Sequence, residues 1–371
     1  MIATPGFVPP PYPYDRLDEI KPLADAHEGG CVDLSIGNPC DPPPPGVIAA
    51  LGGSNSERAY PASIGSLGYR EAAGAWLARR FGAEVAPAHV AACVGTKEFV
   101  ALLPQLLHLR DPSRDTILYP AIGYPTYEMG AILGGCRSVA VPVDDQWRID
   151  LSRIDDADAS RALALWVNTP GNPAGGLDDL DAAAAWGRAR GVPVFSDECY
   201  IEFTWAGPGR TILRSGIEGV VAVHSLSKRS NLAGARAGFY AGDPGLVHYL
   251  SEVRKHAGLM VPGPVQAAAV AAFADDAHVD AQRSRYHDRL VRMAALLGRL
   301  GIEATLPRGG FYLWVRAPNG DAWGLTRLLA SELGILVSPG EFYGTAGAGH
   351  IRIAVVQPDA KMDLVEQRVG R

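Results

Sequence analysis

The stretch SLSKRSNLAGARAG, residues 225–238, decides how this chain folds. It follows the apolar run GVVAVH, residues 219–224, which is typical of a buried strand in a parallel sheet. Lys228 therefore stands just past the carboxyl end of a strand, and Arg236 follows eight residues later among small residues. A lysine that is desolvated in a pocket has a lowered pKa, which favours Schiff-base chemistry. A solvated surface loop is the alternative that this stretch alone leaves open.

Composition places the chain among globular proteins with a large core. Its 371 residues are 47% hydrophobic and 20% charged, which predicts two domains and no long disordered segment. The net charge of -6 and the lack of a basic patch with interleaved aromatic residues argue against nucleic-acid binding.

The cysteines and the apolar runs bear on compartment and metal binding. The five cysteines are scattered and form no C-x-x-C pair, so the spacing favours free thiols and indicates no metal site. No apolar run is long enough to span a bilayer. The first residues, MIATPG, lack the basic and apolar regions of a secretion signal. We therefore expect a cytoplasmic protein without a membrane segment or a metal ion.

Helix and strand patterns alternate from about residue 46 onwards. This alternation predicts an α/β fold with a mostly parallel central sheet and helices on both faces. A small α+β domain follows, in which we expect a strand at 304–306. The N-terminal segment is rich in proline, so we expect no regular helix there. The predicted parts are an N-terminal arm that packs with the small domain (1–45), a large cofactor-binding domain (46–260), and a helical connection with the small C-terminal domain (261–371).

Polar residues follow several of the predicted strands. In a sheet of this kind, ligands bind at the carboxyl ends of the strands. A further turn at residues 95–97 places a glycine between a strand and a helix start, where unpaired backbone N–H groups can hold an anion. The strand ends that we expect to converge carry Asn172, Asp197 with Tyr200, and Ser225 with Lys228.

This set of groups matches the needs of an aldehyde-bearing pyridine phosphate. Such a cofactor needs a lysine for its covalent link, a carboxylate at the ring nitrogen and an aromatic ring that stacks on the pyridine. It also needs donors for its hydroxyl and phosphate groups, and a planar guanidinium suits the phosphate. The residues we assign are Lys228 for the link, Asp197 for the ring nitrogen, Tyr200 and Asn172 for the hydroxyl, Gly95, Thr96, Lys97, Ser225 and Arg236 for the phosphate, and Tyr124 for the stacking ring, with Tyr127 as its alternative.

The same motifs resemble those of the class I and II aminotransferases of fold type I, which depend on pyridoxal 5'-phosphate. The resemblance covers nearly the whole chain and is closest to the actinobacterial N-succinyl-diaminopimelate aminotransferases. The stretches that carry the family resemblance are residues 225–238, NPAG (172–175), DECY (197–200) and Arg352; those that carry the closer one are VDLSIG (32–37), GTKE (95–98), YPTY (124–127), SDECY (196–200) and RKHAG (254–258).

The resemblance implies roles for the assigned residues. Lys228 would move the proton between the substrate and the cofactor, with Asp197 and Tyr200 as the other catalytic residues. Arg352, in an apolar alternating strand, would bind the substrate α-carboxylate. The residues that would border this carboxylate are Gly37, Asn38 and Asn172.

One residue is implied to act on another subunit. Tyr60 lies in a loop that reaches the phosphate of the neighbouring subunit in the family, so we expect a homodimer with shared sites. The groups that bind the distal end of the substrate are not identified by any motif. Arg229 and Asn231 are near enough to Lys228 to be considered, but pointing away from the site is the equal alternative.

The implied reaction is amino transfer between N-succinyl-LL-2,6-diaminopimelate and 2-oxoglutarate in lysine biosynthesis. It would proceed in two half-reactions through the pyridoxamine form of the cofactor. An aminotransferase with another donor (aspartate, an aromatic amino acid or another diaminopimelate derivative) is the nearest alternative. A lyase or decarboxylase on the same fold is a second, disfavoured because an arginine that holds the carboxylate leaves the Cα–H bond as the one to break. A regulatory binding module is a third, disfavoured by the lack of a basic patch.

Overall fold

The computed structural model describes residues 6–369 and is built around a seven-stranded sheet. Residues 1–5, part of the segment searched for a secretion signal, lie outside this description. Strand β8 runs antiparallel to both of its neighbours, and the other pairs of the sheet are parallel. The expected mostly parallel α/β sheet is thus confirmed. Across the sheet the strands are β2 (Val90–Cys93), β8 (Gly238–Gly242), β7 (Val220–Ser225), β6 (Val194–Asp197), β5 (Ala162–Asn168), β3 (Thr116–Pro120) and β4 (Arg137–Val141).

Both faces of this sheet are buried under helices. Successive side chains of a strand point to opposite faces, so an apolar run such as β7 packs on two layers at once. Val221 and Val223 belong to one core cluster and Val220 and Ala222 to the other. One face carries α4 (Thr96–Arg110), α5 (Thr126–Leu133) and α9 (Pro244–His256); the other carries α2 (Pro45–Gly53), α3 (Leu67–Phe81), α7 (Leu180–Arg190) and α10 (Gly263–Ala274).

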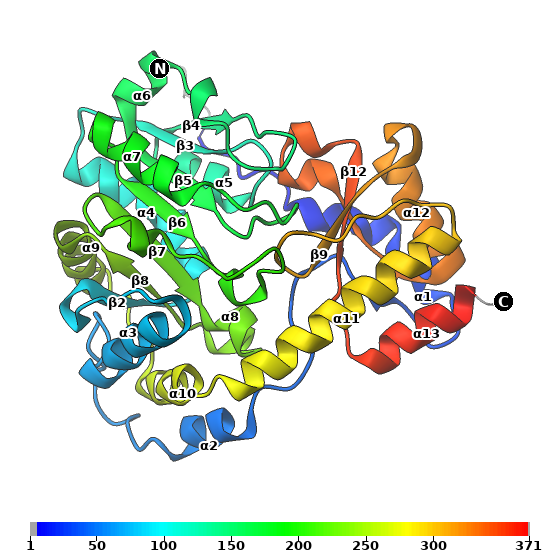
Figure 1. The fold of residues 1–371 in the computed structure, drawn as a ribbon, viewed down its shortest axis with the longest axis horizontal. Helices are drawn as coiled ribbons and strands as arrows, with labels where there is room; N and C mark the ends of the chain where they lie inside the picture. Colours follow the sequence, from blue (N-terminus) through cyan, green and yellow to red (C-terminus); the bar gives the residue numbers. More distant parts are fainter. Residues whose placement is uncertain (1–5, 370–371) are drawn as a thin grey trace.

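A second, smaller unit stands beside the large sheet (Figure 1). Its antiparallel sheet has the order β11 (Ser338–Pro339), β12 (His350–Ala354) and β9 (Tyr312–Arg316). The long helix α11 (Ala277–Arg299) runs from the end of α10 to this unit. Further helices are α12 (Ala322–Leu333) and α13 (Asp359–Val369) in the small unit, and α6 (Asp156–Arg161) and α8 (Leu226–Arg229) in the large one.

The N-terminal arm contains helices, which corrects the expectation drawn from its prolines. It forms a 3-10 helix, η1 (Pro13–Glu19), and the short helix α1 (Lys21–Asp25). In each, proline occupies the first turn, where the missing N–H group would have had no helical acceptor. Beyond α1, which contacts α12, strand β1 (Val32–Asp33) pairs in parallel with β10 (Ile335–Leu336).

The expected strand at residues 304–306 is absent from the structure, which has an irregular segment there. Ala304 packs against the core of the small unit, whereas the side chain of Leu306 is 44% exposed. The apolar residues of this segment therefore reflect packing without backbone pairing. Strand β8 was not singled out from the sequence, because its two terminal glycines resemble a turn signal.

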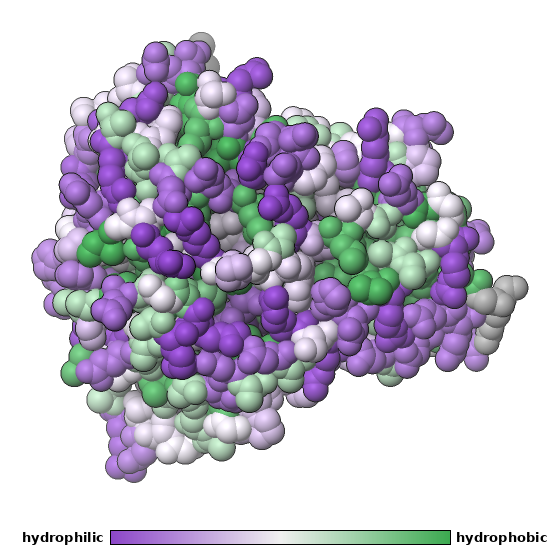
Figure 2. Space-filling view, viewed as in Figure 1, coloured by the Kyte–Doolittle hydropathy of each residue, from purple (hydrophilic) through white to green (hydrophobic). Residues whose placement is uncertain are grey.

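Several global features of the described chain bear on function. Between residues 6 and 369, no helix has both the length and the apolar character needed to cross a membrane. In the same range, no cluster of His, Cys, Asp and Glu is arranged to hold a metal ion. The five cysteines are free. Figure 2 shows one face covered mainly by hydrophilic residues, with hydrophobic residues in small groups between them.

Candidate active site

A cavity of about 410 Å³ opens at the carboxyl ends of β5, β6 and β7, where the large unit meets the small one. Its walls come from the large sheet, from the N-terminal arm and from strands β9 and β12 of the small sheet. The residues assigned from the sequence that line it are Gly37, Thr96, Lys97, Tyr124, Asn172, Asp197, Tyr200, Ser225, Lys228, Arg236 and Arg352.

Strand geometry explains why these side chains meet. Because side chains alternate along a strand, Asp197 and Ser225 lie on the same face as Phe195 and Val223. Phe195 and Val223 belong to the core cluster under α4, so this face of the sheet leads to the amino end of α4. A carboxylate, a hydroxyl and a helix N-terminus are thereby brought to one edge of the sheet.

Lys228 lies in α8, a single turn that begins directly after β7. Ser225 caps this turn, since its Oγ accepts a hydrogen bond of 3.1 Å from the backbone N–H of Ser227. The Lys228 ammonium donates a hydrogen bond to the carbonyl oxygen of Gly37. Burial lowers the pKa of Lys228 to about 8, and the positive charges of Arg352 and Arg236 act in the same direction. The neutral, nucleophilic fraction of Lys228 near neutral pH is thus far larger than for an ordinary lysine, although it is the minor form.

Asp197 forms the floor of the cavity and is held by two donors. Its Oδ2 accepts a hydrogen bond of 3.0 Å from the hydroxyl of Tyr127, and its Oδ1 accepts one of 3.2 Å from the backbone N–H of Cys199. Burial raises the pKa of Asp197, and the hydrogen bonds from Cys199 and Tyr127 oppose this rise. The hydroxyl of Tyr127 is therefore bound to Asp197. Of the two tyrosines considered for the stacking ring, Tyr124 is the one that lines the cavity.

The amino end of α4 and Arg236 form a cradle at one end of the cavity. Gly95 precedes α4 with a φ of 75°, and a Cβ atom there would lie 2.1 Å from Nη2 of Arg236. Arg236 itself has a left-handed backbone and donates a hydrogen bond of 2.8 Å to the carbonyl of Ala233. A helix N-terminus beside a guanidinium and the hydroxyl of Ser225 suits a phosphate.

Arg352 stands at the other end, buried in β12. Its Nη1 donates a hydrogen bond of 2.8 Å to Oδ1 of Asn172, and its Nη2 donates one of 2.5 Å to the carbonyl of Ser35. The rings of Tyr312 and Tyr343 lie 4.2 and 4.6 Å from its guanidinium carbon. These neighbours are neutral, and within residues 6–369 no carboxylate forms an ion pair with Arg352, so its charge is suited to an anionic ligand.

Tyr200 does not stand alone in the cavity wall. Its hydroxyl lies 2.7 Å from that of Tyr312, in hydrogen-bonding contact. Tyr312 also explains why position 37 is a glycine, because a Cβ atom at Gly37 would lie 2.0 Å from the Tyr312 hydroxyl oxygen. The arm, β9 and the loop after β6 are therefore packed tightly around Tyr312.

The structure places some of the considered residues outside the cavity. Tyr60 is 94% exposed and lies in a separate surface pocket, and Asn38 is exposed beside Gly37. Arg229 is buried and points away from the cavity, toward Glu202. Asn231 contacts Gln282 of α11 at 3.3 Å. Neither residue beside Lys228 that was left open lines the cavity.

Sequence reasoning missed several residues of the cavity wall. Some lie inside the quoted motifs without an assigned role, such as Thr126 and Cys199, and others lie in segments distant from the motifs. Tyr14 is an example, since its hydroxyl lies 2.8 Å from that of Tyr343 although the two are 329 residues apart. No local pattern predicts such a contact. The lining residues not assigned are Tyr12, Pro13, Tyr14, Ile36, Pro125, Thr126, Asn168, Cys199, Ser227, Ala233 and Tyr312.

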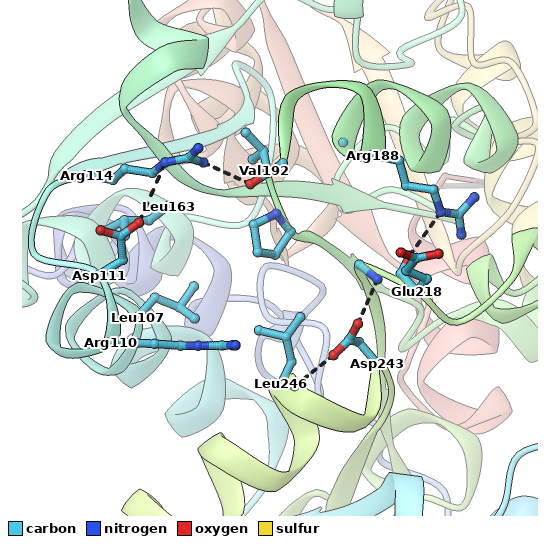
Figure 3. A pocket seen from close by; sticks show the side chains of 14 residues that line it. Leu107, Arg110, Asp111, Arg114, Leu163, Arg188, Val192, Glu218, Asp243 and Leu246 are labelled. Carbon is cyan, nitrogen blue, oxygen red and sulfur yellow. Dashed lines mark hydrogen bonds and ion pairs between the residues drawn. The ribbon is translucent and has the colours of Figure 1, made fainter.

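A larger cavity, of about 710 Å³, lies at the opposite, amino edge of the strands (Figure 3). Two of its arginines, one just after α4 and one in the last turn of α7, donate hydrogen bonds to backbone carbonyls. Arg114 donates to Gly191 and Ala162, and Arg188 donates to Glu218 and Gly216. This cavity has neither a lysine nor a buried unpaired carboxylate, so it offers no comparable chemistry.

The residues of the smaller cavity fit pyridoxal phosphate. A buried carboxylate at Asp197 has a raised pKa, and a protonated ring nitrogen would stabilise its ionised form. Lys228 lies in the same cavity. Because Gly95 has no side chain, a phosphate can approach the backbone at the start of α4 beside Arg236. The volume lies within the usual range for a small-molecule site.

Comparisons with known proteins agree with this arrangement. The family model described as aminotransferase class I and II matches residues 30–369. A probable aminotransferase of Mycobacterium tuberculosis, Rv1178, is 42% identical, covering 98% of this chain and 85% of its own length. The 4-dedimethylamino-4-oxo-anhydrotetracycline transaminase OxyQ of Streptomyces rimosus is 41% identical, covering 97% and 99%. An LL-diaminopimelate aminotransferase of Desulforudis audaxviator is 32% identical, covering 97% and 95%.

Solved structures give the same result. An aminotransferase from Neisseria meningitidis superposes with a TM-score of 0.89 at 30% identity, covering 97% of both chains. A probable N-succinyldiaminopimelate aminotransferase from Thermus thermophilus superposes with a TM-score of 0.86 at 28% identity, covering 96% of this chain and 99% of the other. The similarity thus extends over nearly the whole fold.

Proposed function

Because the chain belongs to the aminotransferase class I and II family and depends on pyridoxal phosphate, we propose that it transfers an amino group between N-succinyl-LL-2,6-diaminopimelate and 2-oxoglutarate. Family membership gives the reaction class. The choice of donor rests on the motifs of the sequence and on the similarity to the probable N-succinyldiaminopimelate aminotransferase of Thermus thermophilus.

The position of Arg352 is the observation that carries the reaction type. It is 2% exposed and faces the cavity that holds Lys228. A substrate α-carboxylate bound by its guanidinium would place the Cα–H bond within reach of Lys228, whose lowered pKa suits a base near neutral pH. The bound cofactor supplies the electron sink that makes this proton acidic. Arg352 orients the substrate and Lys228 moves its proton.

The rim of the cavity supports an acidic distal group on the substrate. Lys97 lies at this rim, and its ammonium stands 5.2 Å from the ring centroid of Tyr12. Lys97 is exposed and can reach toward the cavity mouth without a large desolvation cost. A succinyl carboxylate is an anion of the right kind for such a lysine, as is the side-chain carboxylate of glutamate.

We also place the enzyme in a homodimer with shared sites. The support is Tyr60, which is 94% exposed in the single chain although it is aromatic. Its neighbours in a surface pocket include Arg58 and Gln266. A large exposed tyrosine beside polar groups is typical of an interface residue.

A second candidate acceptor follows from the similarity to OxyQ. The two chains align over nearly their full lengths at 41% identity. OxyQ is a transaminase of 4-dedimethylamino-4-oxo-anhydrotetracycline. The cavity mouth of this chain is lined by Tyr12 and Tyr14, which would also pack against an aromatic ring system.

A half-reaction assay tests the proposal and separates the two candidates. The holoenzyme is mixed with N-succinyl-LL-2,6-diaminopimelate, glutamate, aspartate or phenylalanine, and loss of the visible cofactor absorbance is followed. We expect the succinylated donor and glutamate to convert the cofactor fastest. Fast conversion by aspartate or phenylalanine with none by the succinylated donor would overturn the donor assignment. Turnover of 4-dedimethylamino-4-oxo-anhydrotetracycline with glutamate, but not of the succinylated donor, would select the second candidate.

A further inference from the structure

Arg229 directly follows the lysine of the site but belongs to a different environment. Its side chain is 2% exposed and points away from the cavity. Its Nη1 donates hydrogen bonds to the carbonyl of Ala272, at 2.5 Å, and to Oγ of Ser230, at 3.1 Å. Its Nη2 lies 3.2 Å from the carbonyl of Asp275 and 3.2 Å from Oδ1 of Asp276. Arg229 therefore fixes the α8 turn to a distant segment through several bonds at once.

That segment is the junction between two helices. Ala272 is in the last turn of α10 and Asp275 is its C-cap, so Arg229 satisfies carbonyl groups at the end of the helix. Asp276 is the N-cap of α11, the helix that leads to the small unit and to Arg352. Arg229 thus joins the turn that carries Lys228 to the point where the chain leaves the large unit (Figure 1).

A buried glutamate completes this anchor. Glu202, in the 3-10 helix η4 (Ile201–Phe203) after β6, is 5% exposed and approaches Nε of Arg229 at 3.3 Å. Glu202 also accepts a bond of 2.7 Å from the indole N–H of Trp76 and pairs with Arg80 of α3 at 2.8 Å. Two arginines therefore share one buried carboxylate, and only one of them is next to Lys228.

The α8 turn needs such an external anchor. It spans Leu226–Arg229, and a helix of one turn is not stable by itself. Within the turn, the N–H of Ser227 bonds to Oγ of Ser225, and backbone bonds run from the Ser230 N–H to Leu226 and from the Leu226 N–H to Ala237. These bonds are local to the turn, whereas the Arg229 side chain ties it to a separate segment of the large unit. A rotation of the turn would move the Lys228 ammonium, at the end of a long side chain, by more than the backbone moves.

We propose that Arg229 is a positioning residue for Lys228: its bonds to the α10–α11 junction set the rotation of the α8 turn and hence the place of the lysine ammonium. This proposal rests on the role assigned above to Lys228 as the residue that binds the cofactor. It assigns to the Arg229 side chain an effect on the lysine itself, beyond stabilising the fold.

Arg80 provides a matched control, because it pairs with the same Glu202 but belongs to α3. Holoenzymes carrying Arg229→Met, Arg229→Lys and Arg80→Met are compared with the unchanged protein. The readouts are the thermal midpoint, the pH midpoint of the visible absorbance of the lysine-bound cofactor, and kcat and KM for the amino donor. The pH midpoint reports the environment of Lys228 and does not depend on turnover.

We expect both Met variants to lower the thermal midpoint. Only Arg229→Met should shift the absorbance midpoint, by about 0.5 pH unit or more, a threefold change in the ionisation equilibrium. It should also lower kcat about tenfold with KM changed less than about twofold, because small misplacements of a reacting group cost up to about 100-fold. Arg229→Lys keeps the charge but cannot reach both Ala272 and Asp275, so it should shift the midpoint in the same direction by a smaller amount.

Two results would overturn the proposal. One is a folded Arg229→Met protein whose absorbance midpoint and kcat match those of Arg80→Met. The other result applies if Arg229→Met does not fold. In that case, an Arg229→Lys protein whose absorbance midpoint and kcat equal those of the unchanged protein would overturn the proposal. If instead Lys228 does not bind the cofactor, the failure can be told apart. The unchanged protein would then show no visible absorbance that borohydride removes by reducing a link to Lys228.

Discussion

Asn172 Oδ1 accepts a hydrogen bond of 2.8 Å from Nη1 of Arg352, although the two residues are 180 positions apart. Asn172 belongs to the loop after β5 of the large sheet and Arg352 to β12 of the small one. The bond therefore crosses from the part of the cavity assigned to the cofactor to the part assigned to the substrate carboxylate. It orients the guanidinium before any ligand is present, which reduces the cost of binding a carboxylate.

Replacing Arg352 by lysine should weaken substrate binding while leaving the cofactor in place. A lysine keeps the charge but loses the planar fork and the bond to Asn172. Loss of a charged hydrogen bond costs about 1.5–3 kcal/mol, so we expect kcat/KM to fall about tenfold to 100-fold. Steady-state kinetics with the amino donor measure this. Arg316→Lys, at an exposed position of the neighbouring strand β9, is the control and should be unchanged. Equal kinetics for both variants would contradict the role of Arg352.

Replacing Gly95 by alanine should lower the affinity for pyridoxal phosphate. The new Cβ would lie 2.1 Å from Nη2 of Arg236, so the guanidinium must leave the cradle. We expect the dissociation constant to rise about tenfold or more, which corresponds to about 1.4 kcal/mol. Titration of the apoenzyme with cofactor gives this constant.

Gly82→Ala is the control for backbone strain. Gly82 also has a positive φ, of 63°, but a Cβ there meets nothing within 4 Å. Its replacement should cost about 1–2 kcal/mol of stability and leave cofactor affinity unchanged. If the two variants bind the cofactor equally well, the cradle does not depend on Gly95.

How far the sequence predicts the site depends on what fixes each residue. Lys228 and Asp197 could be assigned because a covalent link and a ring-nitrogen partner each admit few residue types, and because strand ends of a parallel sheet meet at one edge. The same rule predicts the central sheet. Its antiparallel strand β8 was not predicted, because the glycines at its two ends resemble a turn signal.

The tertiary neighbours of the motif residues could not be predicted. Tyr14 lies 3.3 Å from Nη2 of Arg352 across 338 positions of sequence, and its segment gave only a proline signal. Whether the Arg229 side chain points into the cavity or away from it could not be predicted either, because this too depends on tertiary packing. Both Lys228 and Arg229 lie in one helical turn, and only the packing of α10 and α11 decides which of them is directed toward the cavity.

Mixed dimers test whether two chains share each site. Tyr60→Ala and Lys228→Ala variants are each expected to be impaired, the second completely. In a dimer of one chain of each kind, one site would combine an intact Lys228 with the intact Tyr60 of the partner chain. We therefore expect mixing, under conditions that exchange subunits, to restore activity to about a quarter of the unchanged level or more. Activity that never exceeds the average of the two parents would show that Tyr60 acts within its own chain or not at all.

The buried pair Glu198–His224 predicts how stability depends on pH. Glu198 Oε2 lies 3.3 Å from Nε2 of His224, and both side chains are at most 2% exposed. Burial raises the pKa of Glu198 to about 8 and lowers that of His224 to about 3. In the folded protein the pair therefore holds one proton between pH 3 and pH 8.

The unfolded chain binds protons differently, with pKa values of 4.5 for the glutamate and 6.5 for the histidine. Between these two values both states hold one proton on the pair, so its contribution to stability is level. Above pH 6.5 the folded state binds more protons than the unfolded one, so stability falls as the pH rises toward 8. Below pH 4.5 the unfolded state binds more, so stability falls as the pH drops.

Replacing Glu198 by glutamine should remove the alkaline part of this dependence. Glutamine is close to glutamic acid in size but does not titrate, so the loss between pH 6.5 and pH 8, about 2 kcal/mol at most, should disappear. Thermal midpoints of the two proteins at pH 6.0 to about 8.5 measure the difference. Glu218→Gln, at an exposed position, should follow the unchanged protein. Parallel curves for Glu198→Gln and the unchanged protein would mean that Glu198 is already ionised at pH 6.5, held by an imidazolium at His224.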